Sequence, residues 1–260
     1  MTCWWPTFFE AGIVLFVLMT ALWAISVRAR DVSIVDSVWG PAFGLAAIVY
    51  SFGCPGWTPR KILVLALVLV WGLRLGLHIF RRNHGKGEDF RYREFRRKYG
   101  PGYWWISFFQ VFLLQGILVW VISTPLLASL DSPSPAHWTL FDAAGVAVWA
   151  TGIFFEATGD WQLARFKSDP ANKGKLMTTG LWSWTRHPNY FGDSCVWWGL
   201  FLVACSNPTG WVTWFSPTIM TILLVGVSGV AMLERTMRTR PGYPEYAART
   251  SAFFPLPPRT

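Results

Sequence analysis

The chain has 260 residues, of which 53% are hydrophobic and only 14% are charged. Soluble globular domains carry about 25% charged residues, so this composition excludes an ordinary soluble domain. The 18 Trp and 20 Phe favour a membrane bundle with interfacial aromatic belts. In a soluble protein the net charge of +9 would indicate nucleic acid, but here the positive-inside rule explains it, and we expect no nucleic-acid partner.

Seven apolar stretches are long enough to cross roughly 30 Å of hydrocarbon as helices. They cover residues 8–27, 34–52, 61–80, 105–128, 138–159, 188–206 and 211–233. Neither a Ser/Gly-rich linker nor an internal repeat divides them, so we predict an all-α polytopic helical bundle forming a single integral membrane domain over residues 1–260. The N-terminus lacks a basic segment and a cleavage site, so the first stretch is expected to remain as a span.

Lys and Arg concentrate in alternate connections, meaning the segments between consecutive predicted spans. The first, third and fifth connections and the tail are basic, the second holds Arg60 and Lys61, and the fourth and sixth hold neither residue type. The positive-inside rule then predicts an outer N-terminus and a cytoplasmic C-terminus. Cys3 and Cys54 fall on the outer side, where the sequence leaves open whether they pair. Cys195 and Cys205 are expected in the core, and without a CxxC motif no metal site is predicted.

The second and third stretches carry polar groups that are costly inside a membrane. Asp36 lies one turn before Trp39, and desolvation favours the neutral carboxyl, which can donate to a carbonyl oxygen. The alternative is a helix-packing hydrogen bond. A helical spacing relates Trp71, Arg74, His78, Arg81 and Arg82, and the intramembrane charge of Arg74 requires a partner such as Asp36 or a ligand phosphate.

Two connecting segments carry further candidates. The segment GEDFRY, with Asp89 and Tyr92, is suited to adenosine or ribose, or is a solvated loop. Asp160 and Arg165 follow the fifth stretch at the membrane edge. Arg165, Lys167, Lys173 and Lys175 can hold phosphates, although positive-inside charge alone also explains these bases.

The segment RHPNYFGD opens the sixth stretch. Arg186 and His187 precede a helix that Pro188 is suited to begin, where phosphate is attracted; as an alternative they are interfacial anchors. Asn189 and Asp193 share one helical face.

The C-terminal tail mixes aromatic and basic residues. It includes Arg235, Arg238, Tyr246 and Arg249, a pattern that can fold over a nucleotide or lie on lipid headgroups. Glu234 and Arg238 have the i,i+4 spacing of a surface ion pair.

Together, RHPNYFGD at 186–193, DSVWG at 36–40, GEDFRY at 87–92 and ERTMR…GYPEYAARTSAFFP at 234–255 resemble the steroid 5-alpha-reductase superfamily, most closely its bacterial seven-span branch. The resemblance implies a monomeric enzyme of the bacterial inner membrane that uses NADPH to reduce a conjugated C=C bond in a steroid-like or other lipid enone. It implies that Asp36 is the acid that polarises the carbonyl. Trp71 falls where steroid reductases have a catalytic Tyr, and Asp36 replaces their Glu.

The resemblance also implies a large cofactor site. Asn189 and Asp193 would hold the nicotinamide or its ribose, and Arg74 and His78 would line the pocket. The complete predicted cofactor-binding set is Trp39, Arg74, His78, Arg81, Arg82, Asp89, Tyr92, Asp160, Arg165, Lys175, Arg186, His187, Asn189, Asp193, Arg235, Arg238, Tyr246 and Arg249. The competing interpretations are a membrane methyltransferase that uses S-adenosylmethionine, which explains the wide basic set poorly, and a non-enzymatic protein that binds anionic lipid.

Overall fold

The computed structural model describes residues 3–227 and 229–259. Residues 1, 2 and 260 of the predicted domain, and Ser228 of the seventh predicted span, lie outside the described residues. The structure is 79% helical, and its described part contains no strand. Six of its helical segments are long and apolar enough to cross a membrane, which confirms the all-α polytopic bundle. The predicted count of seven is not confirmed, because α9 (Pro188–Ala204) is not among these six segments, although its 17 residues are at the lower limit for a span.

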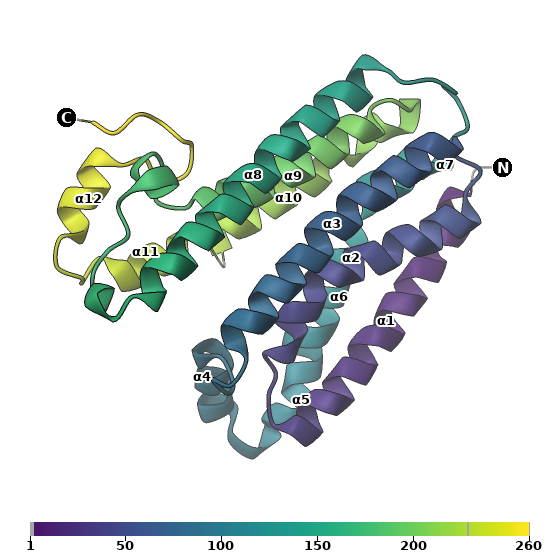
Figure 1. Cartoon of the computed structure of the whole chain (residues 1–260). Coiled ribbons are helices and arrows are strands. Elements are labelled where there is room, and N and C mark those ends of the chain that lie inside the picture. Colours follow the sequence, from purple (N-terminus) through teal and green to yellow (C-terminus); the bar gives the residue numbers. More distant parts are fainter. Residues whose placement is uncertain (1–2, 228, 260) are drawn as a thin grey trace. The chain divides into compact units, whose positions relative to one another are not determined.

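The chain forms two compact units (Figure 1). Unit 1 comprises Met1–Thr139 and Ala204–Thr213, and unit 2 comprises Leu140–Val203 and Trp214–Thr260. The single domain predicted above stays a prediction. Unit 1 contains α1 (Trp4–Ala29), α2 (Ile34–Gly53), α3 (Thr58–Asn83), α4 (Phe90–Tyr99), α5 (Tyr103–Ser107), the π-helical η2 (Phe108–Leu113), α6 (Leu114–Ile122) and α7 (Thr124–Asp131).

Small residues bring α2 and α3 into close contact. A Cβ added at Gly72 would lie 2.5 Å from the Gly40 carbonyl oxygen, and one added at Gly40 would lie 2.7 Å from the Gly72 carbonyl oxygen. Backbones approach this closely where glycines face each other across a membrane helix pair. Phe43 and Trp71, both fully buried, fill the adjoining layer with ring centroids 5.6 Å apart. This packing fixes the position of Asp36 at the start of α2 relative to α3.

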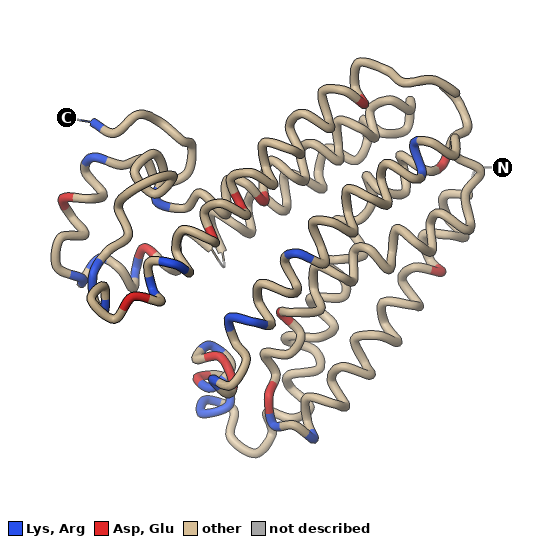
Figure 2. The backbone as a smooth tube through the Cα atoms, viewed as in Figure 1, with Lys and Arg blue, Asp and Glu red and all other residues tan. Residues whose placement is uncertain are grey.

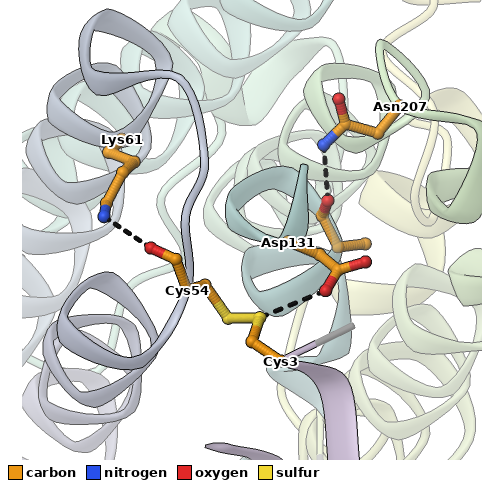
Figure 3. The surroundings of a disulfide bond; sticks show 6 residues. Cys3, Cys54, Lys61, Asp131 and Asn207 are labelled. Atoms are coloured by element: carbon orange, nitrogen blue, oxygen red, sulfur yellow. Dashed lines mark hydrogen bonds between the residues drawn. A yellow bond between two sulfur atoms is a disulfide. The ribbon is translucent and has the colours of Figure 1, made fainter. Parts of the chain in front are cut away.

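A disulfide joins the start of α1 to the residue after α2 (Figure 3). Cys3 and Cys54 are bonded, so the pairing that the sequence left open is present. Lys61 Nζ donates to the Cys54 carbonyl over 2.8 Å, and Asp131 Oδ1 lies 3.1 Å from Cys3 Sγ. The two sulfur atoms and the Asp131 carboxylate lie within 4.8 Å of one another, but the disulfide leaves no thiolate to bind a metal.

Unit 2 contains α8 (Leu140–Ser168), most of α9, α10 (Phe215–Ile222), α11 (Val230–Met237) and α12 (Tyr243–Arg249). Its two long helices, α8 and α9, meet through glycines seven residues apart. A Cβ added at Gly192 would lie 2.5 Å from the Gly152 carbonyl oxygen, and one added at Gly145 would lie 2.7 Å from the Gly199 carbonyl oxygen. A seven-residue spacing keeps these glycines on one seam of each helix.

Basic residues mark one end of each unit (Figure 2). In unit 1 most Lys and Arg residues lie in α4 and at the ends of α1 and α3, away from the N-terminus. In unit 2 they surround the end of α8, α11, α12 and the tail. The polar groups predicted to form the site belong to these ends.

Candidate functional site

In unit 1, two side chains of α4 donate hydrogen bonds to Asp36, which lies at the start of α2. Arg91 Nη2 lies 2.7 Å from Asp36 Oδ2, and the Tyr92 hydroxyl donates to Asp36 Oδ1 over 2.7 Å. Gln115 Nε2 donates to the Tyr92 hydroxyl oxygen over 3.3 Å. The predicted acid is therefore part of a polar network, with its two oxygens accepting from a guanidinium and from a phenol.

The loop before α4 locks this network in place. Asp89 caps α4 by accepting from the Arg91 backbone N–H, and it also pairs with the Arg91 side chain at 2.9 Å. Burial works to raise the pKa of Asp89, but the hydrogen bonds from Arg91 outweigh burial and hold that pKa below its ordinary value. Glu88 accepts two hydrogen bonds from Arg96 and one from the Val32 backbone N–H. The GEDFRY segment thus supports Asp36, in place of the solvated loop considered above.

The remaining predicted residues of unit 1 lie along α2 and α3. Trp39 packs edge-to-face on Phe43, which contacts Trp71, so both predicted indoles belong to one aromatic row. Arg74 and His78 are partly buried on α3. Arg81 and Arg82 are exposed in its last turn.

In unit 2, Arg186 fastens the C-terminal tail to the segment before α9. Its Nε donates to Glu234 Oε1 over 2.7 Å, and its Nη1 donates to the carbonyl oxygens of Ala247 and Thr250. The Arg186 backbone N–H donates to the Ser251 carbonyl over 2.8 Å. The side chains of Arg186 and Glu234 are only 11% and 14% exposed. Glu234 therefore pairs with Arg186, and the predicted surface pair between Glu234 and Arg238 is wrong.

His187 and two tyrosines complete this tail clamp, defined as Arg186, His187, Glu234, Tyr243 and Tyr246. His187 Nε2 lies 3.3 Å from Glu234 Oε1, and burial lowers the pKa of the His187 imidazole despite that carboxylate. Burial and the hydrogen bond with Glu234 raise the pKa of Tyr243 to about 12. The Tyr246 hydroxyl donates to the Trp182 carbonyl. Each polar group of the clamp has a partner within the fold.

The start of α9 pairs with the end of α8. Asn189 Nδ2 donates to Asp160 Oδ1 over 3.1 Å, which joins two residues of the predicted nicotinamide and diphosphate sets. Asp160 and Asp193 are both buried. Gly159 allows this approach, because a Cβ there would lie 3.0 Å from the Pro188 ring. The Asn189 amide and the Asp160 carboxylate are groups that can bind a carboxamide or a sugar hydroxyl.

The other predicted bases of unit 2 are exposed. Arg165 lies over the Trp161 ring at 5.6 Å, and the remaining members are Lys175, Arg235, Arg238 and Arg249. A cavity of about 260 Å³ lies beside Arg249, between the end of α12 and the returning tail. Arg186, Thr250, Ser251 and Arg259 also line it.

Four polar residues outside the predicted set prove structurally important. Arg91 and Gln115 surround the Asp36 network, and Glu234 centres the tail clamp. Glu156, in the middle of α8, is only 2% exposed. A carboxyl inside an apolar stretch is a signal readable from sequence, and it marks Glu156 as a candidate.

The chain is similar to known proteins that carry different functional descriptions. An uncharacterised protein of Schizosaccharomyces pombe is 25% identical over 279 residues, covering 95% of this chain and 79% of that protein. A Delta(14)-sterol reductase of Ascobolus immersus is 31% identical over 143 residues, or 49% of this chain and 31% of the reductase. A probable O-methyltransferase of Ustilaginoidea virens is 44% identical over 48 residues, or 18% of this chain and 17% of the methyltransferase.

The matches to the two enzymes thus span less than a third of either enzyme. No solved structure matches the chain. A family model for proteins of unknown function, DUF1295, matches residues 22–250, which is most of the sequence. The chain therefore belongs to the DUF1295 family, which is related to the steroid 5-alpha-reductases.

Proposed function

We propose that this membrane protein is an NADPH-dependent reductase of a conjugated C=C bond in a lipid-like enone. The observation that carries the proposal is the similarity to a sterol reductase over 49% of this chain, which accompanies the family assignment. The substrate belongs to the class of steroid-like or other membrane-soluble enones, because an apolar helical bundle offers such molecules access from the lipid phase.

The basic and polar side chains of unit 2 fit a dinucleotide that carries phosphate groups. Arg165, Lys175, Arg235 and Arg238 are exposed cations that can pair with phosphates. Asn189 and Asp160 supply an amide and a carboxylate for the carboxamide and ribose. Arg186 and Tyr246, whose contact with the cofactor stays a prediction, hold the tail that carries part of this basic surface. When bound, NADPH would supply the hydride that saturates the β-carbon.

The acid function is assigned to the Asp36 network. The Tyr92 hydroxyl donates to Asp36 Oδ1 over 2.7 Å, and this phenol is the donor that can turn toward an enolate oxygen while Asp36 positions it. Such a donor in a water-poor site is worth about 3 kcal/mol of transition-state stabilisation. Arg91 keeps the Asp36 side chain oriented, and the proton for the α-carbon comes from water or from a nearby side chain. Trp71 is fully buried against Phe43, and its catalytic role stays a prediction.

A methyltransferase that uses S-adenosylmethionine is the second candidate. The short stretch that is 44% identical to the probable O-methyltransferase favours it. S-adenosylmethionine is a cation without phosphates, so this candidate leaves the basic surface of unit 2 without a ligand.

Ligand binding to the detergent-purified full-length protein separates the candidates. We expect NADPH to raise the thermal unfolding midpoint and to quench the fluorescence of the Trp residues, with NADH less effective. Arg235→Gln/Arg238→Gln should lose most of this effect, and the matched variant Arg93→Gln/Arg97→Gln in α4 should keep it. Stabilisation by S-adenosylmethionine and not by NADPH would overturn the reductase in favour of the methyltransferase.

A further inference from the structure

The tail cavity, the space of about 260 Å³ between the end of α12 and the returning tail, has a net positive lining. Three Arg residues line it: Arg186, Arg249 and Arg259. Glu234 neutralises Arg186 through the ion pair of the tail clamp. Arg249 and Arg259 supply uncompensated charge to the cavity, because no lining residue in the described part of the chain is acidic.

The end of α12 would ordinarily repel an anion, since its last carbonyl groups carry partial negative charge. The carbonyls of Ala247 and Arg249, and that of Thr250 just after the helix, already accept hydrogen bonds. Arg186 donates to the carbonyl oxygens of Ala247 and Thr250, and the Arg259 backbone N–H donates to the Arg249 carbonyl over 2.9 Å. The Thr250 and Ser251 side chains add hydroxyl donors to the lining. The cavity is therefore suited to a phosphate group.

The rim of the cavity indicates where this phosphate comes from. Leu256 lines the cavity and is 51% exposed, and its backbone N–H donates to the carbonyl of Trp184, which is 46% exposed. Phe254, two residues before Leu256, is 65% exposed. Exposed Trp and apolar side chains at the basic end of membrane helices belong in the interfacial layer. A basic pocket at that depth meets the headgroups of anionic lipids.

We propose that the tail cavity binds the headgroup phosphate of an anionic phospholipid, with Arg249 and Arg259 as its charged contacts and Trp184, Phe254 and Leu256 against the acyl region. The shared chemistry is a phosphate ester, which NADPH also carries. The apolar rim favours the lipid, because a nucleotide offers no hydrocarbon to cover these three side chains. The site is independent of the reductase reaction.

The test is native mass spectrometry of the full-length protein released from mixed micelles of phosphatidylglycerol and phosphatidylcholine. We expect the wild type to retain phosphatidylglycerol in preference to phosphatidylcholine. Arg249→Gln/Arg259→Gln should weaken that retention roughly 30-fold, the effect of two interfacial Arg residues. Arg93→Gln/Arg240→Gln, which removes two exposed Arg residues outside the cavity, should match the wild type. Both variants alter exposed side chains, and an unchanged unfolding midpoint verifies their folding.

Three results would overturn the proposal. The first is equal retention of the two lipids by the wild type. The second is equal loss in the two double variants, which would indicate unspecific charge. The third is displacement of phosphatidylglycerol by NADPH at the concentration that saturates thermal stabilisation, which would assign the cavity to the nucleotide. NADPH binding that persists in Arg249→Gln/Arg259→Gln while lipid is lost would support separate sites.

Discussion

Arg186 and Glu234, 48 residues apart in the sequence, form a 2.7 Å ion pair that ties the segment before α9 to α11. The same guanidinium reaches two carbonyl groups at the end of α12. One side chain thus connects three segments of unit 2. Its position in the RHPNYFGD motif shows that part of this motif holds segments of the fold together.

Glu234→Gln should destabilise the protein, because it leaves the Arg186 charge partly buried and without its carboxylate. Breaking one partner of such a pair costs about 3 kcal/mol. Thermal unfolding would measure the loss, and limited proteolysis should then cleave between α11 and the tail. Glu245→Gln, an exposed carboxyl of α12, is the matched control and should leave both measurements unchanged. Wild-type resistance to protease in Glu234→Gln would contradict the assigned role of the clamp.

Stability should fall in mildly acidic solution because of His187. Burial lowers the pKa of His187 in the folded protein below its ordinary value of 6.5. Between the lowered folded value and 6.5 the unfolded chain binds more protons, so the free energy of unfolding decreases as the pH falls through 6.5. Unfolding midpoints between about pH 8 and pH 5.5 would measure this slope. His187→Gln should flatten it, and an identical slope in the variant would assign the effect to other groups.

Tyr92→Phe should reduce enone turnover about 100-fold while leaving NADPH binding intact, because it removes the hydroxyl that donates to Asp36 and can turn toward the enolate oxygen. Asp36→Asn should lower turnover at least as much and should also loosen Arg91. Consumption of NADPH with a panel of enones would measure the rates. Tyr99→Phe, seven residues along α4, is the control. Full turnover in Asp36→Asn would remove the acid from the proposed mechanism.

Gly192→Ala should destabilise unit 2. The added methyl would lie 2.5 Å from the Gly152 carbonyl oxygen and from the Glu156 backbone nitrogen, so α8 and α9 must separate. Overpacking of this kind costs about 1–3 kcal/mol. Gly226→Ala, where a Cβ meets nothing within 4 Å, provides the control in the same unit. Equal unfolding midpoints for the two variants would mean that the helix pair relaxes without cost.

The membrane bundle and its helices were predictable because hydrophobic length is a local property of the sequence. α2 and α3 begin and end within a few residues of the predicted limits. The 105–128 stretch was predicted as one helix, but the structure has π-helical η2 within it and a new helix at Thr124. Pro125 and local packing cause these breaks, and the apolar composition of the stretch does not predict them.

The partners of the site residues were less predictable. Asp36 was identified as an intramembrane carboxyl, but its partner Arg91 lies 55 residues away, in the basic third connection. Glu234 was paired with Arg238 by helical spacing, whereas the partly buried Arg186 offers a stronger interaction in a less aqueous setting. Long-range pairing depends on tertiary packing, which a single sequence does not specify.

The Cys3–Cys54 disulfide makes the fold of unit 1 depend on the redox potential of the solution around it. Disulfides persist in oxidising compartments and are reduced in the cytosol. Cys3 stands at the start of α1, which lies at the end of unit 1 away from α4 (Figure 1), so with the predicted outer N-terminus the two ends of this unit are expected to meet solutions of different redox potential. A chain inserted the opposite way would keep two free thiols there, and α1 and α2 would lose their covalent link. The fraction of the protein that carries this disulfide therefore tests the predicted outer position of the N-terminus.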